Sequence, residues 1–369
     1  MRSLEKGKQN ESLEQSIGRI AYAYGFTSSP ANISKRALAT ASNGANAKTS
    51  ASSALVNIAE SGKGPIQTWG VSRKGSGTLV SFGIFSTRHA IAPAIVVKTA
   101  LSISEVAGFS DLSVLVSSVG DAESRKRFTR ELGNFFKKRN DAIPEDLKAI
   151  VPHDPDLAYR TMLERKDPVV EQMPRSIDYL SESSRKTMLA TLSLFESVGI
   201  AYSIQSRLIA EPGVESELLF AIEGTDKKGE RVRIATGGRY DEYAKRARGA
   251  HAEPAVAMSI EMQGRIDVES LEDEPACFIV HVGDAAKLRS FALLEALWRA
   301  HVAVGQALMT DNLRDQVEKG TASGTKYIAI IGQREALDNT AIVRSVATQV
   351  QTTIPLDKLG NYVTRGHRS

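Results

Sequence analysis

The chain has 369 residues, of which 42% are hydrophobic and 24% charged, a composition ordinary for a globular protein with room for two domains. Its formal charge of +4 permits contact with nucleic acid but does not require it. The single cysteine, Cys277, excludes an internal disulfide, and its apolar surroundings favour a buried thiol over a nucleophile. Apolar runs are too short to span a bilayer, and acidic residues near the start argue against a secretory signal. We therefore expect a cytoplasmic protein with no membrane partner.

The first half of the chain moves from mixed elements into a run of helices. An amphipathic helix is expected over 13–25, a loop over 41–53 in an Ala-, Ser-, Asn- and Gly-rich stretch, a strand over 78–85, a helix over 93–106 and a strand over 112–116. Four helices punctuated by prolines follow, over 122–138, 145–150, 155–166 and 183–198. Together they form a basic helical insert, at about 122–198.

Strands resume after the insert. We expect them over 202–209, 218–223 and 231–235, the last two forming an antiparallel hairpin. After an acidic, proline-terminated hinge at 272–275, strands over 277–282, 327–331 and 342–346 alternate with helices over 285–301, over 313–320 and from Pro355. This alternation predicts a compact α/β domain over 275–369, separate from a first domain over 1–272.

The segment Thr236–Asp241 follows the strand predicted at 231–235. Its two glycines suit a tight turn and leave room for a ligand, while an arginine, a phenol and a carboxylate project from the start of a predicted helix. A structural turn, with Asp241 and Glu242 favouring a helix N-terminus, is the equally weighted alternative.

Gly237-Gly238-Arg239-Tyr240-Asp241 is similar to the G-G-R-Y-D segment of the histidyl-tRNA synthetases and their paralogues, which are class II synthetase relatives. Four further segments resemble that family in the same order: Leu112–Asp121, Met173–Leu180, Ser197–Tyr202 and Tyr327–Glu335. The resemblance implies an α/β (α+β) fold, with a class II synthetase-like antiparallel sheet, helices, the helical insert and a C-terminal α/β anticodon-binding-like domain. It also implies a homodimer that pairs through a first motif, placed here around 31–61.

The catalytic motifs of that family are depleted. The stretch Ile209–Glu217 stands where active relatives carry a segment like R-G-L-D-Y-Y, and it reads as a re-sculpted acidic loop. In the second motif, Trp69–Val80, the strand positions expected to hold arginine and glutamate are apolar or glycine. In the third, Gly264 takes the aligned arginine position and Arg265 follows one residue later. Because each lost phosphate contact removes roughly 1.5–3 kcal/mol, these losses predict a non-catalytic paralogue.

We expect no catalytic residue and no cofactor, with ATP and Mg²⁺ required only if the chain is active. The six histidines have no metal-ligand spacing, so no metal is expected. A vestigial nucleotide or amino-acid pocket is placed at Arg73, Gly237, Gly238, Arg239, Tyr240 and Arg265. RNA contacts are expected on the insert at Arg125, Lys126, Arg130, Lys137 and Lys138, since the family's insert leans toward the acceptor arm of tRNA.

Three readings stay open at this point. The first is a binding or regulatory protein on a synthetase scaffold, with tRNA or another protein as its partner. The second is a divergent histidine–tRNA ligase in which Arg73, Arg239 and Arg265 hold the nucleotide. The third is a regulatory subunit of ATP phosphoribosyltransferase, although such subunits generally lack an anticodon-binding-like domain.

Overall fold

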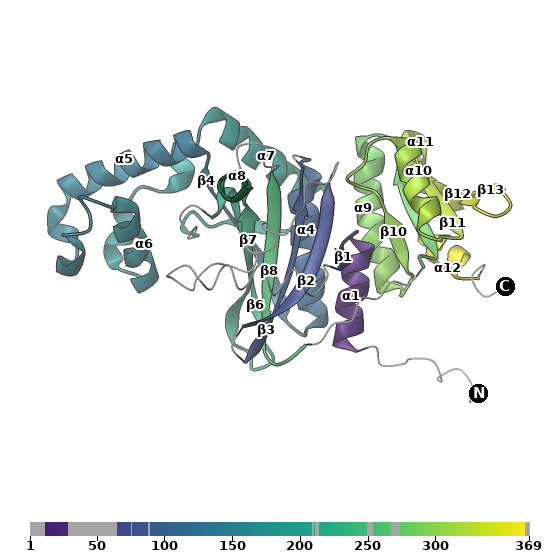
Figure 1. The fold of residues 1–369 in the computed structure, drawn as a ribbon, viewed down its shortest axis with the longest axis horizontal. Coiled ribbons are helices and arrows are strands. Elements are labelled where there is room, and N and C mark those ends of the chain that lie inside the picture. The colour runs from purple at the N-terminus through teal and green to yellow at the C-terminus, as the bar shows by residue number, and fades with distance from the viewer. Residues whose placement is uncertain are drawn as a thin grey trace.

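The computed structural model describes residues 12–28, 65–74, 76–87, 89–208, 210, 214–248, 254–266 and 274–365, which fold around two β-sheets (Figure 1). The first sheet has eight strands in the order β1-β2-β3-β8-β7-β6-β4-β5. Neighbouring strands in this sheet run antiparallel, except for the two outermost pairs, β1–β2 and β4–β5, which are parallel. The strands of this sheet are β1 (Thr27–Ser28), β2 (Ile66–Lys74), β3 (Gly77–Phe85), β4 (Ser110–Gly120), β5 (Tyr202–Ile204), β6 (Ser216–Thr225), β7 (Arg231–Arg239) and β8 (Ala255–Met262).

The second sheet has five strands in the order β10-β9-β11-β12-β13. β9 is parallel to both of its neighbours, and the remaining pairs are antiparallel. Its strands are β9 (Cys277–His281), β10 (Val304–Gln306), β11 (Tyr327–Ile331), β12 (Thr340–Ser345) and β13 (Gln351–Pro355). The helices packed with it are α9 (Asp284–Arg299), α10 (Leu313–Ala322), α11 (Gln333–Asp338) and α12 (Leu356–Arg365). This is the α/β architecture that the alternating pattern predicts.

The helices of the first part are α1 (Leu13–Ala23), α4 (Ile91–Val106), α5 (Ala122–Lys138), α6 (Pro155–Arg165), α7 (Glu182–Ser197) and α8 (Asp241–Arg248). Short polar side chains fix where several of them begin. Ser12 and Gln15 form a reciprocal capping box at α1, and Asp121, Asp154 and Ser181 cap α5, α6 and α7. None of the helices in the described ranges is long and apolar enough to cross a bilayer.

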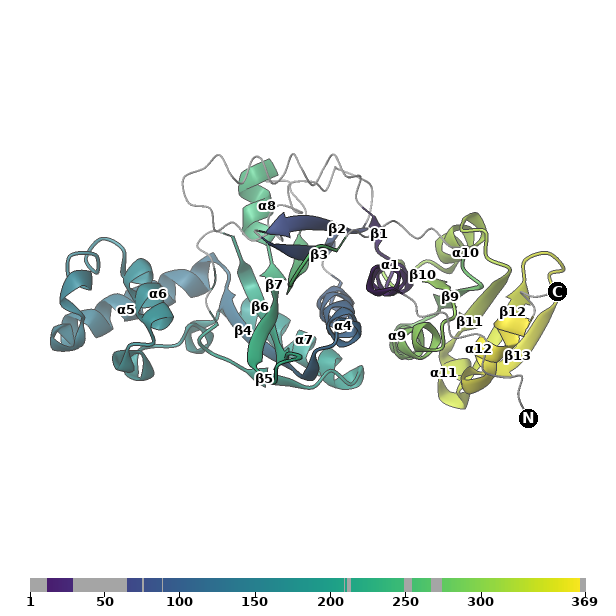
Figure 2. The same cartoon turned by 90° about the horizontal axis from the view of Figure 1, so that it is seen from below.

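α4 packs against the large sheet, and α7 lies beside it (Figure 2). The side chains that β3, β8 and β6 turn toward these helices are large and apolar, as Phe82, Met258 and Phe220 illustrate. The insert helices α5 and α6 project away from the sheet (Figures 1 and 2) and have a hydrophobic core of their own around Phe128, Leu132 and Phe136. The insert is therefore a small helical unit joined to the sheet through β4 and β5.

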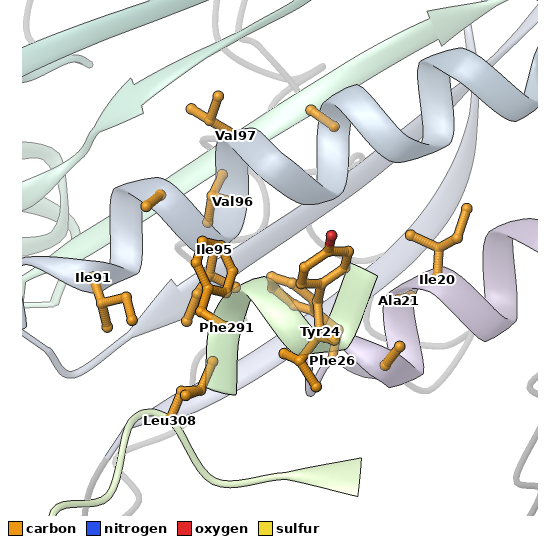
Figure 3. Close-up of a cluster of buried hydrophobic side chains, with 14 of the residues drawn as sticks. Ile20, Ala21, Tyr24, Phe26, Ile91, Ile95, Val96, Val97, Phe291 and Leu308 are labelled. Carbon is orange, nitrogen blue, oxygen red and sulfur yellow. The ribbon is translucent and has the colours of Figure 1, made fainter. Parts of the chain in front are cut away.

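Helix α1 connects the two sheets. Its end carries Tyr24, whose ring meets Phe291 of α9 edge to face at 6.0 Å, while Ile95 and Leu308 lie close by (Figure 3). Ion pairs add to this contact, since Lys98 of α4 lies 2.7 Å from Glu295 of α9. One continuous apolar core thus runs from the large sheet through α4 and α1 into the C-terminal domain.

The structure corrects several predicted elements. β7 continues to Arg239, so Gly237 and Gly238 lie within a strand and not in a turn before a helix. The helix expected over 145–150 is only the 3-10 turn Glu145–Leu147, and the strand expected over 202–209 ends at Ile204. The sequence pattern missed β10, β13 and α11, which are three, five and six residues long. The loop at 41–53 and the first motif at 31–61 lie outside the described residues, as does the first half of the hinge at 272–275.

Candidate functional site: the open sheet face and the helical insert

The large sheet has one face covered by α4 and α7 and one face turned away from them. On the second face, which we call the open face because α4 and α7 do not cover it, most residues in register across β3, β8, β7 and β6 have small side chains. Two successive rows read Ser81, Ser259, Thr236, Ala221 and Gly83, Ala257, Gly238, Leu219. The Oγ atoms of Ser81 and Ser259 lie 2.8 Å apart, so these hydroxyls bond to each other. None of these eight residues has a cationic side chain that could hold a phosphate.

One end of the open face is filled by the protein's own side chains. Tyr240 is fully buried and packs with Phe85, Val214, Ala255 and Ala257. Ile66 and Tyr243 pack against this cluster from its edge. An aromatic ring therefore occupies space over the sheet that an open substrate pocket would need. The sequence signal for this cluster was the alternation of β3, which brings Phe85 to the same face as Ser81 and Gly83.

Gly237 and Gly238 are required by the close approach of neighbouring strands. A Cβ atom on Gly237 would overlap the carbonyl oxygen of Ala257, and one on Gly238 would overlap that of Leu218. Both clashes are with backbone, which cannot move aside as the end of a flexible side chain can. The two glycines thus serve sheet packing, and a ligand is not needed to explain them.

Arg239 points toward the helix-covered side. It is in register with Val256, whose side chain belongs to the main core, so both face away from Tyr240. Its guanidinium donates two hydrogen bonds to the carboxylate of Asp241, Nε at 3.1 Å and Nη2 at 3.2 Å. Asp241 also accepts a hydrogen bond from the backbone of Ala255. The geometry favours the structural interpretation of this segment over the ligand-binding one.

Glu217 lies beside the Arg239–Asp241 pair and is under backbone strain, with a φ of +58°. Burial raises the pKa of its carboxyl group, and the negative charges of Asp121 and Asp241 raise it further. Asp121 itself bonds to Ser124 and Ser181, at the first turn of α5 and the N-cap of α7. This polar cluster joins the insert to the sheet. Glu217 came from the predicted acidic loop, but its partners are distant in sequence.

The remaining two predicted pocket residues lie at the other end of the sheet. The backbone of Arg73 pairs with Thr78, and Thr78 pairs with Met262, shortly before Arg265. Met262 lies six positions along β8 from Val256, the partner of Arg239, which is a distance of about 20 Å along a strand. Arg265 is exposed and follows Gly264, which has a φ of +81°. The structure does not gather the six predicted residues into one pocket.

The insert presents a basic row to solvent. α5 buries Phe128, Leu132 and Phe136, and at 100° per residue Lys126, Arg130 and Lys137 fall on the opposite side within about 40° of one another. All three are exposed, and Lys138 lies exposed on the flank of the row. We call Lys126, Arg130 and Lys137 the α5 basic row.

Arg125 differs from the other basic residues of α5. It is ion-paired with Glu242 at the start of α8 and donates to the backbone oxygen of Gly120. Its side chain is about one third exposed, at 32%. Arg125 therefore ties the insert to the sheet, a contact that sequence could not show because its partner is more than a hundred residues away.

No group of three or more histidine, cysteine, aspartate or glutamate side chains within the described ranges could hold a metal ion. Cys277 is fully buried, and burial raises the pKa of its thiol to about 12, which suppresses the reactive thiolate.

Comparisons with known proteins agree with this architecture. The family model described as the anticodon binding domain matches residues 276–365. The histidine–tRNA ligase of Bacillus licheniformis is 29% identical over 270 residues, covering 71% of this chain and 63% of that protein. The ligase of Limosilactobacillus fermentum is 27% identical over 270 residues, covering 71% and 62%. The chain thus spans a little under two thirds of the length of these curated relatives.

Among solved structures, the apo histidyl-tRNA synthetase of S. aureus superposes with a TM-score of 0.52 at 18% identity, over 98% of this chain and 100% of that one. At that identity the likeness establishes the fold alone. The large antiparallel sheet and the C-terminal domain give the chain a class II synthetase-like fold. More particularly, the chain is similar in sequence to histidine–tRNA ligases and shares the fold of a histidyl-tRNA synthetase.

Proposed function

We propose that this chain is a non-catalytic, tRNA-binding protein built on a histidyl-tRNA synthetase-like scaffold. The observation that carries the proposal is the open sheet face, where Phe85, Val214 and Tyr240 fill one end and small side chains line the middle. Arg239, the cation of the family-like G-G-R-Y-D segment, is turned to the opposite face and neutralised by Asp241. No cofactor is proposed.

Physical magnitudes support the loss of adenylation. A donor aimed at charge developing in a transition state contributes about 10²–10³ in rate. Losing two or three such groups therefore lowers the rate by at least about 10⁴. The side chain of Val214, from the stretch that stands where active relatives carry R-G-L-D-Y-Y, adds a steric block, since it is well buried in the cluster.

The decisive test of inactivity is histidine-dependent ATP–pyrophosphate exchange with Mg²⁺ present. The purified Bacillus licheniformis ligase serves as the positive control in the same buffer. We expect exchange at least 10⁴-fold slower than in the control. Exchange within tenfold of the control would establish the alternative, a divergent histidine–tRNA ligase that uses ATP and Mg²⁺. The regulatory-subunit alternative is disfavoured, because the anticodon binding domain match at 276–365 is a feature such subunits generally lack.

The RNA half of the proposal rests on the α5 basic row. Its ends are eleven residues apart, or about 16 Å along the helix, so the three charges form a line that can follow a phosphate backbone. Lys126 and Lys137 have no carboxylate partner among the described residues, and Arg130 has only a loose contact of 3.4 Å with Glu131. These charges are therefore available to a polyanion.

RNA binding is tested by filter binding of bulk tRNA across 50–200 mM salt. The triple change of Lys126, Arg130 and Lys137 to glutamine should lower the log–log salt slope by roughly 2–3. The matched control removes the same charge from ion-paired residues of the insert that are at least one third exposed: Lys148, Arg165 and Lys186 to glutamine. If both triple variants lower the salt slope of tRNA binding equally, only the net charge of the insert matters. If tRNA binding by the wild type does not change with salt, RNA is not the partner.

A cytoplasmic homodimer completes the proposal. The dimer contact was predicted on 31–61, outside the described residues, so light scattering of the purified chain is the appropriate test. If light scattering gives the mass of a single chain at all micromolar protein concentrations, the dimer is contradicted. Cell fractionation tests the location.

A further inference from the structure

In the described part of the chain, no strand pairs with the outer side of β13, which forms one edge of the five-stranded sheet. Both views place β13 at the outer margin of the C-terminal domain (Figures 1 and 2), and the side chains of Gln351, Thr352, Thr353 and Pro355 are exposed. The opposite edge, β10, is buried and contacts α1. Proteins commonly guard an open edge with charged side chains, because its free backbone groups pair readily with another strand. Residues 345–356 nevertheless contain no charged side chain, in a chain of which 24% is charged.

The backbone groups that β13 offers at this edge follow from its pairing with β12. The amide of Ser345 donates a hydrogen bond of 3.0 Å to the carbonyl oxygen of Val350. Opposed residues in an antiparallel ladder alternate between hydrogen-bonded and non-hydrogen-bonded pairs, so every second residue from Val350 onward directs its backbone groups toward β12. The residues between them, Gln351 and Thr353, therefore direct their N–H and C=O groups outward.

Apolar side chains lie beside these outward-facing backbone groups. Tyr327, Ser345 and Val350 form one row across β11, β12 and β13. The ring of Tyr327 meets that of Tyr362 in α12 edge to face, with the ring centroids 5.8 Å apart. Val350 thus lies on the same face of the sheet as α12, yet it is 61% exposed. Ile354 points to the same face and packs against the main core while it stays partly exposed. This edge therefore leaves apolar area open to solvent.

We propose that β13 pairs antiparallel with β13 of a second copy of this chain, which joins the two C-terminal domains into one continuous sheet. A two-fold axis relates the two strands, so the contact is isologous. Two residues select its register, because Pro355 has no N–H to donate and Gln349 leaves the strand with a φ of +63°. Centring the axis on Thr352 avoids both residues. Gln351 and Thr353 then exchange backbone hydrogen bonds with Thr353 and Gln351 of the partner subunit.

The same register matches the side chains of the two strands. Val350 faces Ile354 of the partner subunit, which covers the exposed apolar area of both, and Thr352 faces its own counterpart in a favourable cross-strand pair. No like charges meet, because the strand carries none. β13 is thus complementary to itself, and this singles out a second copy as the occupant of the edge. Because β13 is only five residues long, the interface is small and we expect association in the micromolar range.

Disulfide crosslinking of the full chain tests the register. In a non-hydrogen-bonded antiparallel pair the two Cα atoms lie about 4.5 Å apart, a separation that a disulfide bridges. Thr352→Cys should therefore crosslink two chains under oxidation by diamide at least tenfold faster than Thr348→Cys. Thr348 is exposed in the same hairpin, but its two copies would lie on the order of 25 Å apart. Cys277 is buried and is present in both variants.

Sedimentation equilibrium between about 1 and 300 μM measures the association itself. Thr353→Pro removes an outward N–H and no hydrogen bond to β12, a change that an edge strand tolerates. This variant should associate at least tenfold more weakly with unchanged circular dichroism, whereas Thr353→Ala, which keeps the N–H, should associate like the wild type. A dimer through 31–61 would persist in Thr353→Pro, so the two contacts are distinguishable. A wild type whose mass equals that of Thr353→Pro at every concentration overturns the proposal, and so does Thr352→Cys crosslinking no faster than Thr348→Cys.

Discussion

The Arg239–Asp241 pair gives a direct test of whether the G-G-R-Y-D segment is structural. The side chains of Arg239 and Asp241 are only 7% and 15% exposed, and two hydrogen bonds join them. Removing one partner of a buried pair costs about 3–5 kcal/mol, because the other charge is left without compensation. Here the residual charge of Asp241 would be worse placed, because another carboxyl group, that of Glu217, lies nearby. We therefore expect Arg239→Met to lower the free energy of unfolding by about 4 kcal/mol.

Urea unfolding followed by circular dichroism measures this loss, and a double-mutant cycle assigns it to the pair. Asp241→Asn alone should also destabilise, while the double variant should recover about 1–3 kcal/mol relative to the sum of the two. The control is Arg175→Met. Arg175 is also doubly hydrogen-bonded to an aspartate, Asp178, but it is 51% exposed, so its replacement should leave the free energy of unfolding nearly unchanged. An Arg239→Met variant as stable as wild type would refute the structural assignment and return Arg239 to the ligand-binding reading.

Three further predictions concern single positions. Gly238→Ala should destabilise the folded protein by about 3 kcal/mol, because the added Cβ atom clashes with backbone. Gly133→Ala, in open space on α5, should stabilise it by about 0.5–1 kcal/mol, and thermal melts compare the two variants. His281 is 2% exposed, and burial lowers its pKa from 6.5 to about 4, so the folded state binds fewer protons and its stability should fall by about 3 kcal/mol as the pH drops from 6.5 to 4. Urea unfolding at pH 7, 5.5 and 4 measures this change, and His281→Leu should flatten that part of the profile. Cys277 should resist iodoacetamide in the folded chain and react only in denaturant, as mass spectrometry would show; rapid native alkylation would contradict the burial of its thiol.

The helical insert shows how far local pattern reaches. The limits of α5 and α6 follow from their capping aspartates and from the apolar spacing, and both were predicted within one residue. The alternating elements of the C-terminal domain were likewise legible, except for β10, β13 and α11. These elements contain too few residues to show a helical or strand periodicity of apolar positions. The two strands among them are specified by pairing with neighbouring strands.

The candidate site was less predictable than the fold. The segment Gly237–Asp241 was singled out correctly as unusual, but its glycines were attributed to a turn. Their reason is the approach of β6 and β8 on either side of β7, which no local pattern contains. The burial of Tyr240 under Val214 and Phe85 was missed for the same reason, since these residues come from three separate segments.

Sequence by itself determined the class of fold, the helical insert, the basic character of α5 and the burial of Cys277. Each of these depends on the spacing or composition of consecutive residues. Tertiary structure alone decided which way Arg239 faces, that Arg125 is tied to Glu242, and that β13 forms an edge of its sheet. These depend on strand register and on contacts between residues far apart in the chain, where a shift of one position moves a side chain to the opposite face of the sheet.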